Sequence, residues 1–347
     1  MKELFIHIGT HKTGTSAIQN FMERNSLLLA KHKLVGELNF NNNIFKLVRT
    51  KSIDSELVND ISRHIADELK ATEAFKLNKF LLSFEGLSGD RELGYKNSHI
   101  IAEHLYQIVQ KLPDITNIKI IIYIRRQDDF IESLYTQTIK EGGTLTFKEF
   151  LEQYDENCFN WDLLIQSYEK VFGKENIIIK RYDKKYLVNS TGLLKDFLDI
   201  LGIHNINKIE GNTDINLGIT KEALEVQRTM NKYFNENEKL DLRMMLEKTN
   251  SKKPFENFSL FSSLDDREIF LKNYVESNNK VSEKYFDRDS LFSPISENHY
   301  TITNSLSMEH ILVVIMKIIM YKDKEISNQK NILNDVVRVL QQNEKKG

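Results

Sequence analysis

Near its start the chain reads Leu4-Phe5-Ile6-His7-Ile8-Gly9-Thr10-His11-Lys12-Thr13-Gly14-Thr15-Ser16. Residues 4–8 are apolar apart from one histidine, which predicts a short buried strand. An amphipathic helix carrying Ile18, Phe21 and Met22 follows the turn. A strand, a turn rich in Gly and Thr and a helix N-terminus form a cradle for an anion, because the first N–H groups of the helix lack partners and the positive end of its dipole faces the turn.

The turn differs from a Walker A loop, whose pattern is G-x-x-x-x-G-K-[ST]. Gly9 and Gly14 have the required spacing, but Thr15 stands where the lysine belongs. The lysine comes earlier, at Lys12. The sequence therefore predicts a nucleotide-phosphate loop with a displaced cation, and not the usual nucleoside-triphosphatase arrangement.

The composition is that of an ordinary soluble globular protein. The chain has 347 residues, of which 40% are hydrophobic, and a formal net charge of −2 at pH 7. The lack of a basic excess argues against a nucleic-acid partner. The single cysteine, Cys158, excludes an intramolecular disulfide and fits a reducing compartment, so we expect a cytoplasmic protein. We expect no secretory signal, because Lys2-Glu3 leads straight into a strand, and no transmembrane segment, because the apolar stretch 311–321 is too short.

Strand-like and helical patterns alternate along the first part of the chain. Short aliphatic runs predict buried parallel strands at 4–8, 80–84, 118–124 and 176–180. Helical spacing of apolar residues lies between them at 54–74, 99–111, 128–141 and 161–172. This alternation predicts an α/β fold, with a P-loop-like parallel β-sheet flanked by helices.

After about residue 217 the pattern becomes mainly helical. Helices are predicted there at 219–234, 264–279 and 308–342. We therefore expect one domain over 1–347, with a nucleotide-binding α/β core over 1–210 and a mostly helical C-terminal portion over 211–347. The charged end of the last helix is predicted to be a surface helix or an oligomer contact.

Polar side chains follow each of the four predicted strands. They are Lys12, Glu85, Arg125 with Arg126, and Tyr182 with Asp183. Ligands of open parallel sheets bind outside the carboxyl ends of the strands. One edge of the sheet therefore collects a lysine, a carboxylate, an arginine pair and a tyrosine, which are the parts of an anionic nucleotide site with a general base.

The end of the third predicted strand carries a second motif. Asp128 and Asp129 suit the first turn of a helix, where carboxylates meet the positive end of the dipole. Ser133 lies on the same helix, so that it and Arg125 can clamp one phosphate between a charged fork and a hydroxyl. The alternative is that Arg125 or Arg126 forms an ion pair with these two aspartates.

At this point the chain resembles the sulfotransferases, which transfer sulfuryl groups from 3′-phosphoadenosine-5′-phosphosulfate (PAPS). Residues 8–16 resemble the 5′-phosphosulfate loop of that family, and 125–133 resemble its 3′-phosphate motif. Residues 171–183 are similar to a later segment, in which an aromatic side chain packs by the adenine. The resemblance is nearest to the bacterial branch associated with carbohydrate acceptors, and it implies in-line sulfuryl transfer from PAPS without a metal.

The resemblance also implies roles for particular residues. The backbone N–H groups and hydroxyls of the loop would hold the 5′-phosphate, namely those of Thr13, Gly14, Thr15, Ser16 and Ala17. Lys12 would stabilise the phosphosulfate and the bridging oxygen as charge develops on it. Arg125 and Ser133 would clamp the 3′-phosphate, and Tyr182 would pack against the adenine.

Two departures from the family pattern bear on the prediction. Many cytosolic members carry an Arg-Lys-Gly segment near the C-terminus that grips the 3′-phosphate, and this chain has no such tripeptide. Many members use a histidine base, where this chain offers Glu85, so we expect a sugar hydroxyl as acceptor. His11, beside the reacting sulfur, is the alternative base. The rival functions are an ATP-dependent kinase, which would want a lysine at position 15, and a non-catalytic nucleotide-binding protein.

Overall fold

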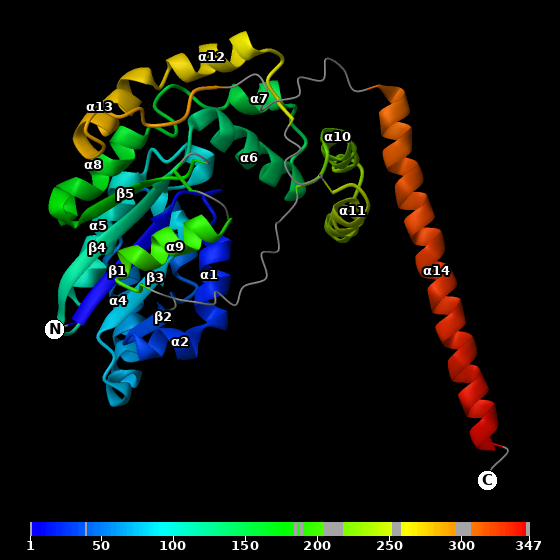
Figure 1. Cartoon of the computed structure of the whole chain (residues 1–347), viewed down its shortest axis with the longest axis horizontal. Coiled ribbons are helices and arrows are strands. Elements are labelled where there is room, and N and C mark those ends of the chain that lie inside the picture. Colours follow the sequence, from blue (N-terminus) through cyan, green and yellow to red (C-terminus); the bar gives the residue numbers. More distant parts are fainter. Residues whose placement is uncertain are drawn as a thin grey trace. The chain divides into compact units, whose positions relative to one another are not determined.

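A five-stranded parallel sheet organises the part of the protein that contains the N-terminus (Figure 1). The computed structural model describes residues 2–38, 40–183, 186–187, 190–204, 218–251, 258–295 and 307–344. The strands are β1 (Lys2–Gly9), β2 (Leu34–Leu38), β3 (Lys79–Ser83), β4 (Ile115–Ile124) and β5 (Ile177–Arg181), and their order in the sheet is β2-β3-β1-β4-β5. The predicted α/β class with a parallel sheet is confirmed.

The strand order fixes where a ligand is expected. β1 lies between β3 and β4. The chain runs from β1 to β2 at one edge, returns through β3, and then crosses to β4 and β5 on the other side of β1. The connections after β1 and β4 therefore leave in opposite directions. This is the switch point of the sheet, at which open α/β folds bind their ligands.

Helices surround the sheet and agree well with the predicted ranges. The helices that belong with the sheet are α1 (Thr15–Arg24), α2 (Ser26–Lys31), α3 (Ile44–Arg49), α4 (Ser55–Ala71), α5 (Ser98–Gln110), α6 (Gln127–Lys140), α8 (Trp161–Phe172), α9 (Ser190–Ile200), α12 (Leu264–Lys272) and α13 (Val275–Tyr285). α8 has the predicted bounds, because Asn160 caps its start and Gly173, with φ of 83°, follows its end. The single helix predicted over 264–279 is wrong, since α12 and α13 are separated at Asn273-Tyr274.

The chain forms two compact units. The first comprises 1–134, 151–214 and 265–295, and the second comprises 135–150, 215–264 and 296–347. The second unit holds most of α7 (Phe147–Leu151), α10 (Lys221–Met230), α11 (Glu236–Thr249) and α14 (Met308–Glu344), so the predicted helical character of this part is confirmed. A single domain over 1–347 stays a prediction, and its expected internal boundary at 210 lies outside the described residues.

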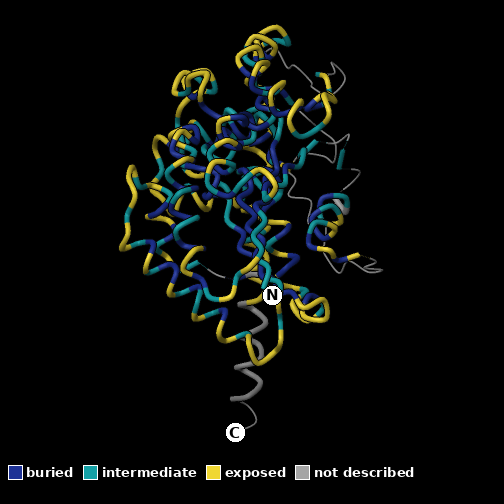
Figure 2. Tube along the Cα trace, turned by 90° about the vertical axis from the view of Figure 1, so that its left-hand side faces the viewer, coloured by how far each residue is buried: buried dark blue, intermediate teal, exposed yellow. Residues whose placement is uncertain are grey.

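The core of the first unit follows from the apolar strands. Figure 2 shows the buried residues concentrated along the sheet and the inner faces of the helices. His7 is buried in this core. Its Nδ1 lies 2.9 Å from Ser83 Oγ, its ring meets Tyr123 and Phe197 edge-on, and burial lowers its pKa to about 3. Its Nε2 has no partner within the described chain. Within the described part of the chain, no helix combines the length and the apolarity that crossing a membrane requires.

Candidate functional site

The turn after β1 requires its two glycines. Gly9 and Gly14 have φ values of 76° and 85°, in the left-handed region that favours glycine. A Cβ on Gly9 would lie 3.0 Å from Glu85 Cβ, and one on Gly14 would lie 2.4 Å from Leu193 Cδ2. Lys12 also has a positive φ, 62°, which is uncommon outside glycine. The turn is therefore tightly constrained on both sides.

Threonine side chains anchor the turn to the sheet. The N–H and Oγ1 of Thr10 both donate to the Tyr123 carbonyl, at 3.0 and 3.1 Å. Thr13 Oγ1 donates to the Thr10 carbonyl at 2.6 Å. These bonds hold the start of the turn against β4. They do not involve the backbone N–H groups that follow, from Thr13 onward.

The turn and the first residues of α1 present a row of hydrogen-bond donors. Within the described residues, no acceptor takes the backbone N–H groups of Thr13, Gly14, Thr15 or Ser16, and no side chain caps the helix. Thr15 Oγ1 is buried and likewise has no partner there. The Ala17 N–H is already used, because it donates to the Gly14 carbonyl at 3.0 Å. Buried polar groups nearly always have partners, so this row of donors, the donor cradle, is what a bound anion would satisfy.

Lys12 and Glu85 come together beside the donor cradle. Glu85 follows β3 as the first residue of a 3-10 turn, Glu85–Ser88, and its backbone lies against Gly9. Burial raises the pKa of Glu85 above its ordinary 4.5, while the charges of Lys12 and Arg91 act in the opposite direction. A half-buried carboxylate with a raised pKa is a better proton acceptor than an exposed one.

His11 is held by a tyrosine that the sequence analysis did not single out. The Tyr95 hydroxyl accepts the His11 N–H at 3.1 Å and lies 2.5 Å from His11 Nδ1. Burial raises the pKa of Tyr95, so the phenol keeps its proton. The direction of the hydrogen bond between the two side chains depends on the tautomer of His11.

Arg125 and Tyr182 join the same site from the ends of β4 and β5. Arg125 Nη1 donates to the Lys12 carbonyl at 3.2 Å, and its guanidinium lies 5.7 Å from the centroid of the Tyr182 ring. The Arg125 carbonyl is fixed by Trp161 Nε1 at 2.8 Å. Tyr182 is half-buried, with its ring also beside Gly14. The structure thus brings together residues from three neighbouring strand ends, as predicted from the parallel sheet.

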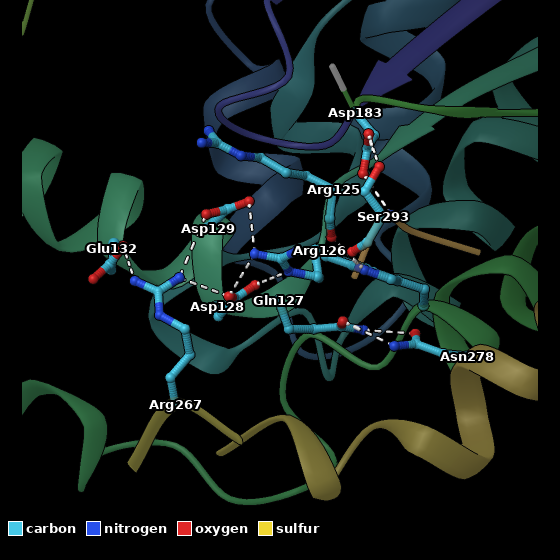
Figure 3. A network of polar contacts seen from close by, with 11 residues as sticks. Arg125, Arg126, Gln127, Asp128, Asp129, Glu132, Asp183, Arg267, Asn278 and Ser293 are labelled. Carbon is cyan, nitrogen blue, oxygen red and sulfur yellow. Dashed lines mark hydrogen bonds and ion pairs between the residues drawn. The ribbon is translucent and has the colours of Figure 1, made fainter. Parts of the chain in front are cut away.

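Arg126 belongs to an ion cluster and not to the loop after β1. Arg126 Nε lies 2.6 Å from Asp128 Oδ1, and its Nη1 donates to the Ser293 carbonyl at 2.8 Å. Arg267 Nη1 lies 2.6 Å from Asp128 Oδ2, and its Nη2 lies 2.7 Å from Glu132. Figure 3 shows Arg125 directed away from this cluster. Of the two alternatives, the ion pair with the aspartates is therefore correct for Arg126, and no such pair joins Arg125 to them in the described structure.

Ser133 and Asp183 occupy different surroundings from those of the loop. Ser133 lies in the second turn of α6, half-buried, and no hydrogen bond joins it to Arg125 in the described part of the chain. Asp183 accepts hydrogen bonds from the N–H and Oγ of Ser293, at 2.9 and 2.7 Å. It therefore ties the segment after α13 to the end of β5.

A separate hollow of about 660 Å³ lies between α5 and α8. His99, Leu163 and Lys170 are among its lining residues, and Tyr95 lines it as well. No residue of the 9–17 loop lines it, nor does Glu85 or Arg125. The hollow is therefore distinct from the donor cradle.

Comparison with known proteins gives limited similarities. No protein-family model matches this chain. An uncharacterized protein of Archaeoglobus fulgidus is 27% identical over 177 residues, which are 50% of this chain and 47% of that protein. The chain thus spans about half the length of the curated relative it matches. The crystal structure of a sulfotransferase from Alicyclobacillus acidocaldarius aligns with 66% of this chain and 95% of its own, at 16% identity and a TM-score of 0.38. These similarities leave the function to be inferred from the residues of the site.

Proposed function

We propose that the protein is a PAPS-dependent sulfotransferase that acts on an acceptor hydroxyl of a carbohydrate or glycoconjugate. The observation that carries the proposal is the donor cradle of 13–16 beside Lys12. An anionic phosphosulfate would accept those hydrogen bonds. The resemblance of residues 8–16 to the 5′-phosphosulfate loop, and the threonine at position 15, favour a phosphosulfate over a nucleoside triphosphate.

In the proposed reaction, a bond forms between the acceptor oxygen and sulfur as the bond from sulfur to the 5′-phosphate oxygen breaks in line. The acceptor proton passes to the Glu85 carboxylate, which contributes a factor of roughly 10²–10⁴ in similar reactions. The leaving oxygen gains negative charge, and the Lys12 ammonium stabilises it. The products are the sulfated acceptor and adenosine 3′,5′-bisphosphate.

We assign the base to Glu85 and not to His11. Burial raises the pKa of Glu85, which makes its carboxylate a better proton acceptor than an ordinary one. His11 Nδ1 is engaged with the Tyr95 hydroxyl at 2.5 Å, which holds the ring at the turn where the sulfuryl group would lie. His11 is therefore proposed to bind the transferred group.

We further propose that Arg125 and Ser133 bind the 3′-phosphate and that Tyr182 packs against the adenine. Arg125 lies at the switch point between β1 and β4 and contacts both the loop and Tyr182. Its guanidinium offers the fork that phosphate oxygens accept. Ser133 supplies a hydroxyl from α6.

Calorimetric titration with adenosine 3′,5′-bisphosphate, adenosine 5′-monophosphate and magnesium-ATP tests the donor site. We expect preference for the bisphosphate, with Arg125→Ala weakening it by about 10–100-fold, the worth of one charged hydrogen-bond partner. The same variant should leave the 5′-monophosphate almost unaffected, because that ligand lacks the 3′-phosphate. Arg63→Ala, at an exposed position of α4, is the control. Preference for magnesium-ATP would contradict the proposal and favour the kinase.

Glu85→Gln is expected to stabilise the protein at neutral pH while lowering sulfuryl transfer by about 10²–10⁴-fold. Burial raises the folded-state pKa of Glu85, so its protonated form is favoured in the folded protein. That contribution is present below the ordinary pKa of 4.5 and is lost as the pH rises through the folded-state pKa. The gain of the variant in unfolding temperature should therefore grow across this window. Thermal unfolding of both proteins over a pH series measures this gain. A gain that does not change with pH would contradict the raised folded-state pKa of Glu85.

A further inference from the structure

Helix α14 of the second unit has two apolar faces, and among the described residues of that unit only one of them is packed. Val314 is 4% exposed, and α14 contacts α10 and α11. Lys248 of α11 donates to the Tyr321 hydroxyl at 3.1 Å. Ile311 and Ile318 lie on the same face, at spacings of three and four residues from Val314, and are half-buried.

The opposite face of α14 is apolar and exposed. Leu312, Met316, Ile319 and Ile326 are 52%, 54%, 46% and 49% exposed. At about 100° per residue, these positions lie on the side of the helix away from Val314. We call these four residues the seam. Further exposed apolar residues flank the seam at Met308, Val313, Ile315 and Met320. A helix that is apolar on both sides requires a partner on each.

The clustering of side chains on this face fits a protein interface. Its eight apolar side chains are 39–71% exposed, whereas exposed apolar residues on ordinary protein surfaces are scattered singly.

The spacing of the seam indicates the kind of partner. Leu312, Ile319 and Ile326 recur every seven residues, and the sequence continues the repeat at 333 and 340. A seven-residue apolar repeat is typical of a helix that pairs with another helix of the same repeat. α14 has 37 residues, whereas α10 and α11 have 10 and 14. Packing along the full length of α14 therefore requires a partner helix of similar length.

The charges beside the seam favour a protein over a membrane surface. Lys322, Asp323, Lys324 and Glu325 alternate in sign along one turn, and Asp323 lies on the same side of the helix as the seam. Helices that lie on anionic membranes carry mostly Lys and Arg on their polar side. We therefore propose that α14 pairs through the seam with α14 of a second copy of this chain, in the two-fold arrangement commonest among homodimers.

The molar mass of the full-length protein, measured by light scattering as it elutes from a size-exclusion column, tests this dimer. We expect the wild type at twice 40.7 kDa and the double variant Leu312→Glu/Ile319→Glu at 40.7 kDa. The control Lys324→Gln/Asn328→Glu changes the net charge by the same amount at exposed positions off the seam, and it should remain dimeric. Circular dichroism confirms that each variant is folded.

A monomeric wild type, or a seam variant that keeps the wild-type mass, would overturn the proposal. Sedimentation with phosphatidylserine vesicles provides a second readout. We expect no binding by the wild type, whereas wild-type binding that the seam variant loses would assign the seam to a membrane surface instead.

Discussion

Arg267→Ala will lower the free energy of unfolding of the protein by about 3–5 kcal/mol, because it removes one partner from a buried ion cluster. Arg267 and Asp128 are both 0% exposed, and Glu132 is 9% exposed. Arg267 lies between these two carboxylates, at 2.6 and 2.7 Å. Without the guanidinium, both carboxylates lose the cation between them in a region of low dielectric constant, although Asp128 keeps its ion pair with Arg126.

Urea denaturation of the wild type and the variant measures this effect. Lys280→Ala is the control, because Lys280 forms an exposed ion pair with Glu276 at 2.7 Å on α13 of the same unit. Exposed pairs contribute about 0–1 kcal/mol, so the control should lose no more than that. Adding Glu132→Gln to Arg267→Ala should recover part of the loss, since it removes one of the two carboxylates that lose Arg267, while the other, Asp128, keeps its ion pair with Arg126. A loss no larger than that of the control would show that the cluster is not stabilising.

The strands of this protein could be predicted because most of them are buried on both faces. β1 and β4 are near-continuous apolar runs, which is the pattern of central parallel strands. β2 was missed because it is a short edge strand in which Gly36 and Glu37 interrupt the apolar run. The break between α12 and α13 was also missed, since neither Pro nor Gly stands at 273–274.

The residues of the site could be predicted only where the strand order alone brings them together. Lys12, Glu85, Arg125 and Tyr182 meet because each follows a strand of one parallel sheet. Tyr95 escaped notice, because its approach to His11 depends on packing against aromatic side chains far away in the sequence, namely Phe130, Phe159 and Trp161.

Arg267 escaped notice for a similar reason. It stands in Asp265-Asp266-Arg267-Glu268, which reads as an exposed turn of helix. The sequence of α6 did contain a clue. Asp128 and Glu132 lie one turn apart on that helix, and Arg126 pairs with the first of them, so a second cation could be expected nearby.

Lys12→Ala is expected to lower PAPS turnover by about 10²–10³-fold while weakening adenosine 3′,5′-bisphosphate binding far less. The ammonium acts on charge that appears on the bridging oxygen as the sulfuryl group leaves, so its contribution is largest in the transition state. The backbone N–H groups of 13–16, which the substitution does not remove, continue to bind the 5′-phosphate. Bisphosphate released from PAPS, with a saccharide mixture or water as acceptor, measures the turnover.

The position of Lys12 calls for a control that separates its charge from its backbone. Its φ is 62°, and alanine in that region is as strained as lysine, so a change in the turn itself has to be excluded. Lys33, exposed and with φ of 59°, provides the match, because Lys33→Ala makes the same substitution in the same backbone conformation away from the site. Lys12→Arg keeps the charge and should retain more turnover than Lys12→Ala. Equal turnover in Lys12→Ala and wild type would contradict the sulfotransferase proposal, whereas a loss confined to Lys12→Ala assigns the effect to the ammonium at the leaving oxygen.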